Sequence, residues 1–121
     1  MKKRAKPRRV RTLRARVWVE ADGQPALTDA GADLLEQIAV WRSLSEAARR
    51  LGFSYRRAWL LLDAMNRRWP RPLVRTATGG RGGGGATITE LGRHVLGTYR
   101  DLQLQVEHLL DAAGDPFKPV E

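Results

Sequence analysis

A run of glycines constrains the fold of this chain more than any other feature, because six of the seven residues from Gly79 to Gly85 are glycine. Glycine loses more backbone freedom on folding than any other residue, so it weakens helices and strands when it lies inside them. So dense a run is typical of a turn, or of backbone that approaches another molecule closely. Apolar, strand-like residues flank it at 73–74 and 86–88. The pattern predicts a hairpin with a glycine tip, and Arg81 gives that tip a positive charge.

Basic side chains are concentrated in two segments of the sequence. Residues 1–16 carry nine lysines and arginines and no acid, and residues 42–81 carry ten arginines against two acids. The intervening and following segments, 17–41 and 82–121, are net acidic. Such segregation predicts that a polyanion binds on one face of the protein. A solubilising role is the alternative for residues 1–10.

The composition excludes several classes of protein. A chain of 121 residues that is 42% hydrophobic supports one domain with a core. It has no cysteine, which excludes disulfides, thiol nucleophiles and thiolate metal sites. No apolar run approaches the ~18 residues of a membrane span, and the basic N-terminus lacks the apolar segment of a signal peptide. We therefore expect a cytoplasmic protein that does not contact a membrane.

The N-terminal part of the chain predicts an arm, a strand and a helix. Residues 1–10 form a like-charge run, which favours disorder. Residues 11–20 alternate between apolar and polar side chains, which predicts a strand with one buried face. Asp22 and Gly23 then predict a turn, and Thr28 is a natural N-cap for a helix.

Two helices joined by a sharp turn are expected from Ser43 to about residue 69. Ser43 fits a capping box with Glu46, and Ser54 caps the second helix. Ala48 is the small residue at which paired helices touch, and Gly52 suits the positive φ of the turn. Further apolar residues complete a helix-turn-helix pattern: Ala47, Leu51, Phe53, Ala58 and Leu61. An ordinary helical hairpin is the alternative.

The second helix of this pair, residues 54–68, has polar and basic residues in its first turn. In helix-turn-helix proteins this turn enters the major groove of duplex DNA, and arginine suits the O6 and N7 atoms of guanine. The expected DNA contacts of the two helices are Ser54, Tyr55, Arg56, Arg57, Arg49 and Arg50. The tryptophans are expected to pack inside instead: Trp18, Trp41, Trp59 and Trp69.

A glycine hairpin after such a helix is expected to be a wing at residues 78–85. Glycine amides approach phosphates without obstruction, and an arginine enters a narrow minor groove. The expected contacts of the wing are Arg75, Thr78, Gly79, Gly80, Arg81, Gly82 and Gly83.

The last helix, expected at about 89–113 with Thr89 as its N-cap, carries apolar residues at steps close to a heptad repeat. The residues of this seam are Leu91, Val95, Tyr99, Leu102, Val106 and Leu109. The seam predicts a homodimer, and packing of the helix on its own domain is the alternative. The domain then covers residues 11–113, and residues 114–121 form a tail.

Residues 54–59, 65–66, 77–86 and 89–92 resemble the winged-helix DNA-binding domain of ModE-type molybdate-dependent transcriptional regulators. The resemblance to LysR-type regulators is more distant. The resemblance to ModE-type regulators covers about residues 27–110. It rests on a Ser-Tyr-Arg-Arg-Ala-Trp motif and a Thr-Gly-Gly-Arg-Gly-Gly-Gly-Gly motif. It implies a bacterial, mainly α winged helix-turn-helix protein with a small β component, an N-terminal strand and a long C-terminal dimerisation helix.

The resemblance also bears on cofactors and partners. Members of the family that sense molybdate carry oxyanion-binding domains after this module. The sequence up to Glu121 has no counterpart of them. We therefore expect no cofactor, and an effector ligand or partner protein stays open. The family dimerises through the N-terminal strand region and the helix after the wing, which implies the same for this chain.

Two functions of other classes compete with a sequence-specific DNA-binding regulator. One is an RNA-binding or nucleoid-associated basic protein without operator specificity, but the sequence lacks interleaved aromatics that stack single-stranded bases. The other is a phosphate-handling enzyme built on the glycine run. This run lacks the Gly-Lys-Ser/Thr ending of a P-loop. The two histidines, His94 and His108, are too far apart to share a site. We do not expect an enzyme.

Overall fold

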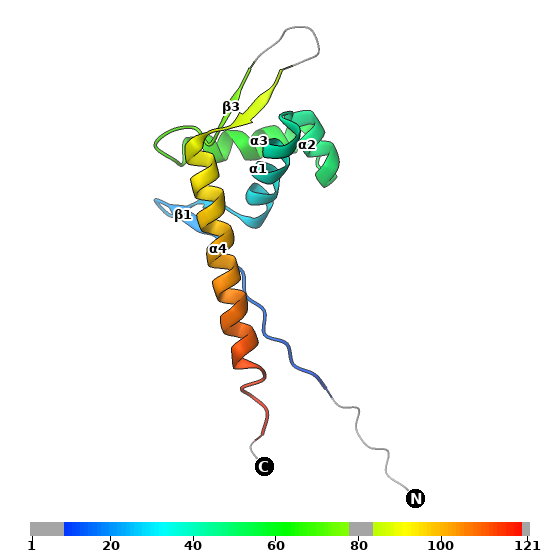
Figure 1. The fold of residues 1–121 in the computed structure, drawn as a ribbon, viewed down its shortest axis with the longest axis vertical. Helices are drawn as coiled ribbons and strands as arrows, with labels where there is room; N and C mark the ends of the chain where they lie inside the picture. Colours follow the sequence, from blue (N-terminus) through cyan, green and yellow to red (C-terminus); the bar gives the residue numbers. More distant parts are fainter. Residues whose placement is uncertain (1–8, 78–83, 120–121) are drawn as a thin grey trace, which may run out of the picture.

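The computed structural model describes residues 9–77 and 84–119, so most of the expected N-terminal arm lies outside it. The described residues form two hairpins and four helices (Figure 1). The elements are β1 (Val19–Ala21), β2 (Gln24–Leu27), α1 (Asp29–Trp41), α2 (Leu44–Leu51), α3 (Tyr55–Arg67), β3 (Val74–Thr76), β4 (Ala86–Ile88) and α4 (Glu90–Ala113). Each hairpin is antiparallel, β1 with β2 and β3 with β4. This is the mainly α fold with a small β component that the sequence predicts.

The four helices start at the N-cap residues that the sequence predicts. In each case the hydroxyl of the cap accepts a hydrogen bond from the backbone N–H three residues later, at 3.0–3.2 Å. These caps are Thr28, Ser43, Ser54 and Thr89. Gly52 ends α2 at φ 70°, a left-handed conformation that glycine adopts without strain. The turn of the helix-turn-helix is therefore confirmed.

One hydrophobic core joins the helices to the bases of both hairpins. Leu34, Leu35 and Ile38 of α1 are completely buried at its centre. From the helix-turn-helix, the small residues Ala47 and Ala58 are equally buried, and α2 packs directly on α3. In Figure 1, α1, α2 and α3 gather at one end of α4, and the β3–β4 hairpin projects from that end, away from both termini. The hairpin thus extends beyond the helices as a wing.

The N-terminal strand is much shorter than the sequence predicts. Only Val19–Ala21 is a strand, and it pairs with β2, which the sequence pattern does not predict. Residues 9–18 form no strand, because alternation supplies a buried face but no hydrogen-bonding partner, and no other described strand pairs with them. α3 also ends at Arg67, one residue before the end of the predicted range 54–68.

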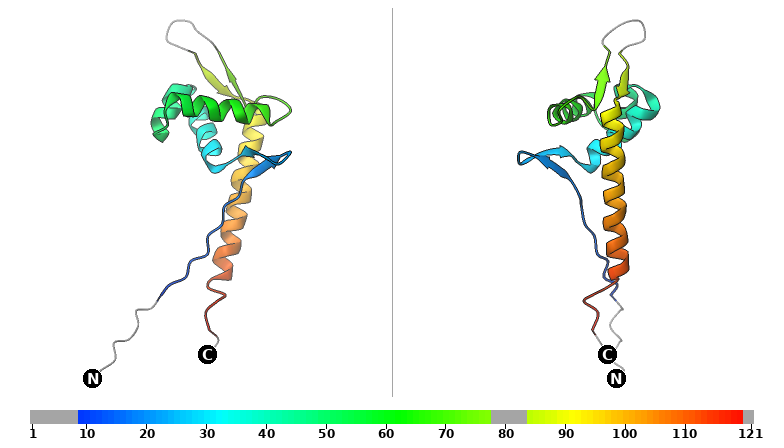
Figure 2. Two further views of the ribbon diagram at one scale, coloured as in Figure 1. Left: turned by 180° about the vertical axis from the view of Figure 1, so that it is seen from behind. Right: turned by 60° about the vertical axis from the view of Figure 1, so that its left-hand side comes forward.

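Helix α4 changes character along its length. Val95 and Tyr99, two residues of the expected dimer seam, are buried in the core of their own domain. Beyond them the helix extends away from the other helices, and Leu102 and Leu109 are 42% and 69% exposed (Figure 2). The first half of the expected seam therefore packs within its own domain, which is the alternative to a dimer seam. The second half is exposed to solvent.

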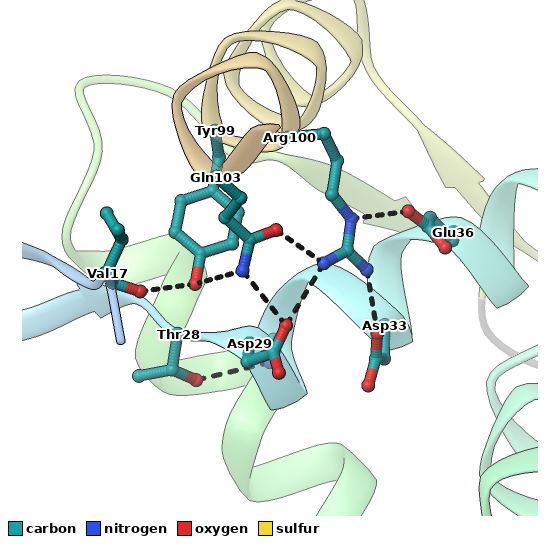
Figure 3. Close-up of polar contacts among 9 residues, drawn as sticks. Val17, Thr28, Asp29, Asp33, Glu36, Tyr99, Arg100 and Gln103 are labelled. Atoms are coloured by element: carbon teal, nitrogen blue, oxygen red, sulfur yellow. Dashed lines mark hydrogen bonds and ion pairs between the residues drawn. The ribbon is translucent and has the colours of Figure 1, made fainter. Parts of the chain in front are cut away.

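A polar cluster fastens α4 to α1 where the helix leaves the core (Figure 3). The guanidinium of Arg100 donates hydrogen bonds to Asp29, Asp33 and Glu36 of α1, at 2.6–3.1 Å. A hydrogen bond from Gln103, reinforced by Arg100, lowers the pKa of Asp29. These contacts keep α1 and α4 at a fixed angle and neutralise part of the acidic charge on α1.

Candidate nucleic-acid interface

The first turn of α3 is solvent-exposed, as the helix-turn-helix pattern requires. Tyr55 is 58% exposed, and Arg56 is exposed beside it. The Ser54 hydroxyl already accepts the N–H of Arg57 at 3.1 Å, so its first role is to cap the helix. Arg56 and Tyr55 are thus the members of the predicted set that α3 presents most freely.

Arg57 faces a different direction from Arg56. Its guanidinium stacks on the ring of Phe53, 3.9 Å from the ring centroid, and it lines a groove between the start of α1 and the second half of α4. Successive residues of a helix are about 100° apart, so Arg56 and Arg57 point in different directions. The side chains of Tyr55 and Arg56 are exposed, whereas the guanidinium of Arg57 stacks on Phe53.

Arg49 and Arg50 of α2 are held by a carboxylate. Glu46 accepts hydrogen bonds from Arg49, at 2.6 and 3.1 Å, and from Arg50, at 3.0 Å. These bonds lower the pKa of Glu46 to about 2, so it stays ionised at neutral pH. The Arg50 guanidinium also lies 3.9 Å over the Trp41 ring. The Glu46 side chain therefore orients these arginines, instead of closing the predicted capping box with Ser43.

The prediction that the tryptophans pack inside is wrong for Trp18, Trp41 and Trp59. Their exposed fractions are 55%, 41% and 48%. Trp69 is partly buried, and its indole N–H donates to the Ala26 carbonyl at 3.0 Å. Smaller side chains fill the inward face of α3 and leave no position there for Trp59: Ala58, Leu62 and Met65.

Asn66 fixes the wing to the end of α3, a role that sequence reasoning missed. Its Oδ1 accepts the backbone N–H groups of Leu73 and Val74 at 2.9 and 3.2 Å, and its Nδ2 donates to the Val74 carbonyl at 3.1 Å. A single amide thus binds the first residue of β3 and the residue before it. The only signal in the sequence is a polar residue directly after Met65, at the edge of the buried face of α3.

Replacing Asn66 by alanine is expected to destabilise the fold by about 1–3 kcal/mol, because two N–H groups and one carbonyl lose their partner in a half-buried position. Thermal unfolding followed by circular dichroism measures the effect. Gln37→Ala is the matched control, since within residues 9–77 and 84–119 that amide makes one hydrogen bond, which it accepts from the Trp41 indole N–H. Equal losses in the two variants would contradict the role given to Asn66.

The base of the wing is held on its other strand as well. β3 and β4 pair in the register Val74↔Ile88 and Arg75↔Thr87, and Arg75 is exposed. The N–H of Ala86 donates to the carbonyl of Arg42, at the corner between α1 and α2, at 3.1 Å. The expected contacts at the tip, Thr78, Gly79, Gly80, Arg81, Gly82 and Gly83, lie outside the described residues. The wing base is therefore set at a defined angle to the helix-turn-helix.

Candidate metal clusters and membrane-spanning helices are both absent from residues 9–77 and 84–119. This part of the chain holds no group of three His, Cys, Asp or Glu side chains that could bind a metal ion. None of its helices has the length and apolarity needed to cross a membrane.

Known proteins are similar to this chain, although no family model matches it. It is 37% identical over 106 residues to the molybdenum transport protein ModE of Azotobacter vinelandii, which covers 88% of this chain and 39% of that protein. It is 42% identical over 74 residues to the DNA-binding transcriptional dual regulator ModE of Escherichia coli K12, covering 61% of this chain and 28% of that protein. The chain thus spans about two fifths or less of the length of these relatives. The chain belongs to the ModE-type family and folds as a winged helix-turn-helix.

Proposed function

We propose that this chain is a DNA-binding transcriptional regulator that reads duplex DNA with α3 and the wing. The observation that carries the proposal is the joint display of these two elements. α3 lies on the outside of the molecule with the β3–β4 hairpin beside it (Figure 2, left), and Asn66 links them. Arg56 on α3 and Arg75 on β3 are both exposed. A relative that bears the name DNA-binding transcriptional dual regulator supports the same function.

Competition between nucleic acids tests this function. Labelled duplex DNA is bound to the pure protein, and unlabelled duplex DNA or structured RNA of equal length and charge is added. The proposal expects duplex DNA to compete better, because an α-helix enters the major groove of B-form DNA but not the deep, narrow groove of RNA. Stronger competition by RNA would favour the RNA-binding alternative.

We further propose that the functional unit is a homodimer joined through the second half of α4. A groove of about 1340 Å³ opens between this half and the N-terminal segment, and its apolar walls include Leu13, Trp18, Leu104 and Leu110. Leu102 and Leu109 of the same half are exposed as well, and a second copy can cover this apolar surface. Light scattering of the pure protein at micromolar concentration is expected to give twice the mass of the chain, and a monomer would contradict the dimer.

The proposed binding needs neither a cofactor nor a catalysed reaction. All the proposed DNA contacts come from side chains and backbone of this chain. Molybdate or a chelator added to the binding assay is therefore expected to leave the affinity for duplex DNA unchanged. A change in affinity with molybdate would show that this chain binds an oxyanion effector.

Removing residues 1–10 takes away six lysines and arginines. We expect all duplexes to bind more weakly and alike, because interactions with phosphate carry no sequence information. The logarithmic salt dependence of the affinity is expected to flatten by about 0.9 for each phosphate that these side chains no longer neutralise. Fluorescence anisotropy over a salt series measures this slope, and a full-length variant with glutamine at the six positions is the matched control. An unchanged slope in both would confine residues 1–10 to a solubilising role.

A further inference from the structure

Two large apolar side chains that are adjacent in the sequence are half exposed in the second turn of α3. Trp59 and Leu60 are each 48% exposed, whereas the residue before them, Ala58, is completely buried. Single exposed apolar residues are ordinary on protein surfaces. An adjacent tryptophan and leucine, on the helix that also presents Tyr55 and Arg56, form a defined apolar patch. We name Trp59 and Leu60 the second-turn patch.

Helix geometry places this patch inside the proposed DNA-reading surface. Residues four apart share a face of a helix, so Trp59 follows Tyr55 and Leu60 follows Arg56 along α3. One turn further on, Asp63 pairs with Arg67 at 2.8 Å, so the carboxylate there is neutralised. The second-turn patch therefore continues the surface of the first turn without an uncompensated negative charge.

The patch also borders the wing. Trp59 and Asn66 are seven residues apart, which is two helical turns, so they share one side of α3. Asn66 contacts the start of β3 from that side. Trp59 thus lies on the side of α3 that faces the wing, between the two elements proposed to contact DNA.

The indole N–H of Trp59 differs from those of the other tryptophans. Trp18, Trp41 and Trp69 donate theirs to Glu20, Gln37 and Ala26, at 3.0–3.1 Å. Trp59 makes no such bond within residues 9–77 and 84–119. Its ring therefore offers an apolar face together with a donor for a phosphate or a base acceptor.

We propose that Trp59 and Leu60 contact thymine methyl groups and so give the protein a preference for thymine under the second turn of α3. The inference rests on the proposed function. Arginines on the same helix and wing favour a polyanionic ligand, and the C5-methyl of thymine is the apolar group that the major groove displays. An apolar patch within a basic surface matches that group.

A pair of duplexes that differ only in this methyl group tests the inference. The duplex recovered by selection from random DNA is synthesised once with thymine and once with uracil, which pairs identically but lacks the methyl. The protein is expected to bind the thymine duplex about fourfold more tightly for each methyl that the patch covers, the value of one buried methylene-sized group. Equal affinity for the two duplexes would overturn the inference while leaving DNA binding intact.

Variants assign the effect to the patch. Trp59→Ala and Leu60→Ala are each expected to reduce the preference for thymine over uracil, whereas Leu60→Met is expected to keep it. Phe117→Ala is the matched control, because Phe117 is 70% exposed beyond the end of α4, away from α3. Circular dichroism confirms that each variant folds. Undiminished discrimination in both alanine variants would overturn the inference, and failure of the parent to bind either duplex would overturn the proposed function itself.

Discussion

Alanine at Arg56 is expected to weaken binding to the cognate duplex by about 1–3 kcal/mol and to relax the base preference at one position. Arg56 is exposed in the first turn of α3, and none of its neighbours in the described chain forms an ion pair with it. Its guanidinium is therefore available for a bidentate contact with guanine. Fluorescence anisotropy on the cognate duplex, and on the three duplexes altered at the contacted pair, measures both effects.

Arg67→Ala is the matched control for this variant. It removes the same charge from the same helix, but the Arg67 side chain is already paired with Asp63 at 2.8 Å. Its removal leaves the Asp63 carboxylate unpaired, so it is expected to weaken binding to all duplexes alike and to leave the base preference unchanged. If Arg67→Ala relaxed the base preference as Arg56→Ala does, general charge would explain the effect, and the assignment of Arg56 to a base would be wrong.

Alanine at Gly92 is expected to destabilise the fold by about 3 kcal/mol, at the upper end of the usual cost of overpacking. A Cβ atom there would lie 2.2 Å from the Leu73 carbonyl oxygen and 2.8 Å from Cγ1 of Ile88. The carbonyl belongs to the backbone and also accepts the Thr89 N–H at 2.9 Å, so it cannot withdraw without breaking the base of the wing. Chemical denaturation followed by circular dichroism measures the decrease in stability.

Gly97→Ala provides the opposite expectation on the same helix. A Cβ atom at Gly97 would meet nothing within 4 Å. Alanine is the better helix former by about 1 kcal/mol, so this variant is expected to be as stable as the parent or more stable. Equal destabilisation by the two substitutions would contradict the close approach of α4 to the wing base.

Local signals in the sequence predict the helix-turn-helix well. The N-caps, the glycine turn at Gly52 and the hairpin around the glycine run depend on neighbouring residues, and each is present in the structure. The strand expected at 11–20 is mostly absent because a strand also needs a partner, which a pattern of alternation does not supply. The dimer seam is ambiguous for a related reason, since a heptad-like stripe on α4 cannot reveal that Tyr99 packs inward while Leu109 does not.

The candidate site is predictable only in part. Tyr55 and Arg56 follow from the position of the first turn, and both are exposed there. The pairing of Arg57 with Phe53, and of Arg49 with Glu46, depends on side-chain rotamers that the sequence does not specify. Tryptophan is usually buried in small domains, so the sequence predicts that Trp59 lies in the core. In the structure, other side chains already fill the inward face of α3.

Selection of bound fragments from random duplex DNA by the pure protein tests the central claim most directly. The claim is that a dimer reads DNA through two copies of α3, each accompanied by its wing. The selected fragments are expected to share an inverted repeat whose half-sites are about 10–10.5 base pairs apart, or a multiple of that spacing, because the symmetry of the site mirrors that of the protein. Fragments that bind without any shared sequence would contradict the claim and leave a basic protein that binds DNA without operator specificity.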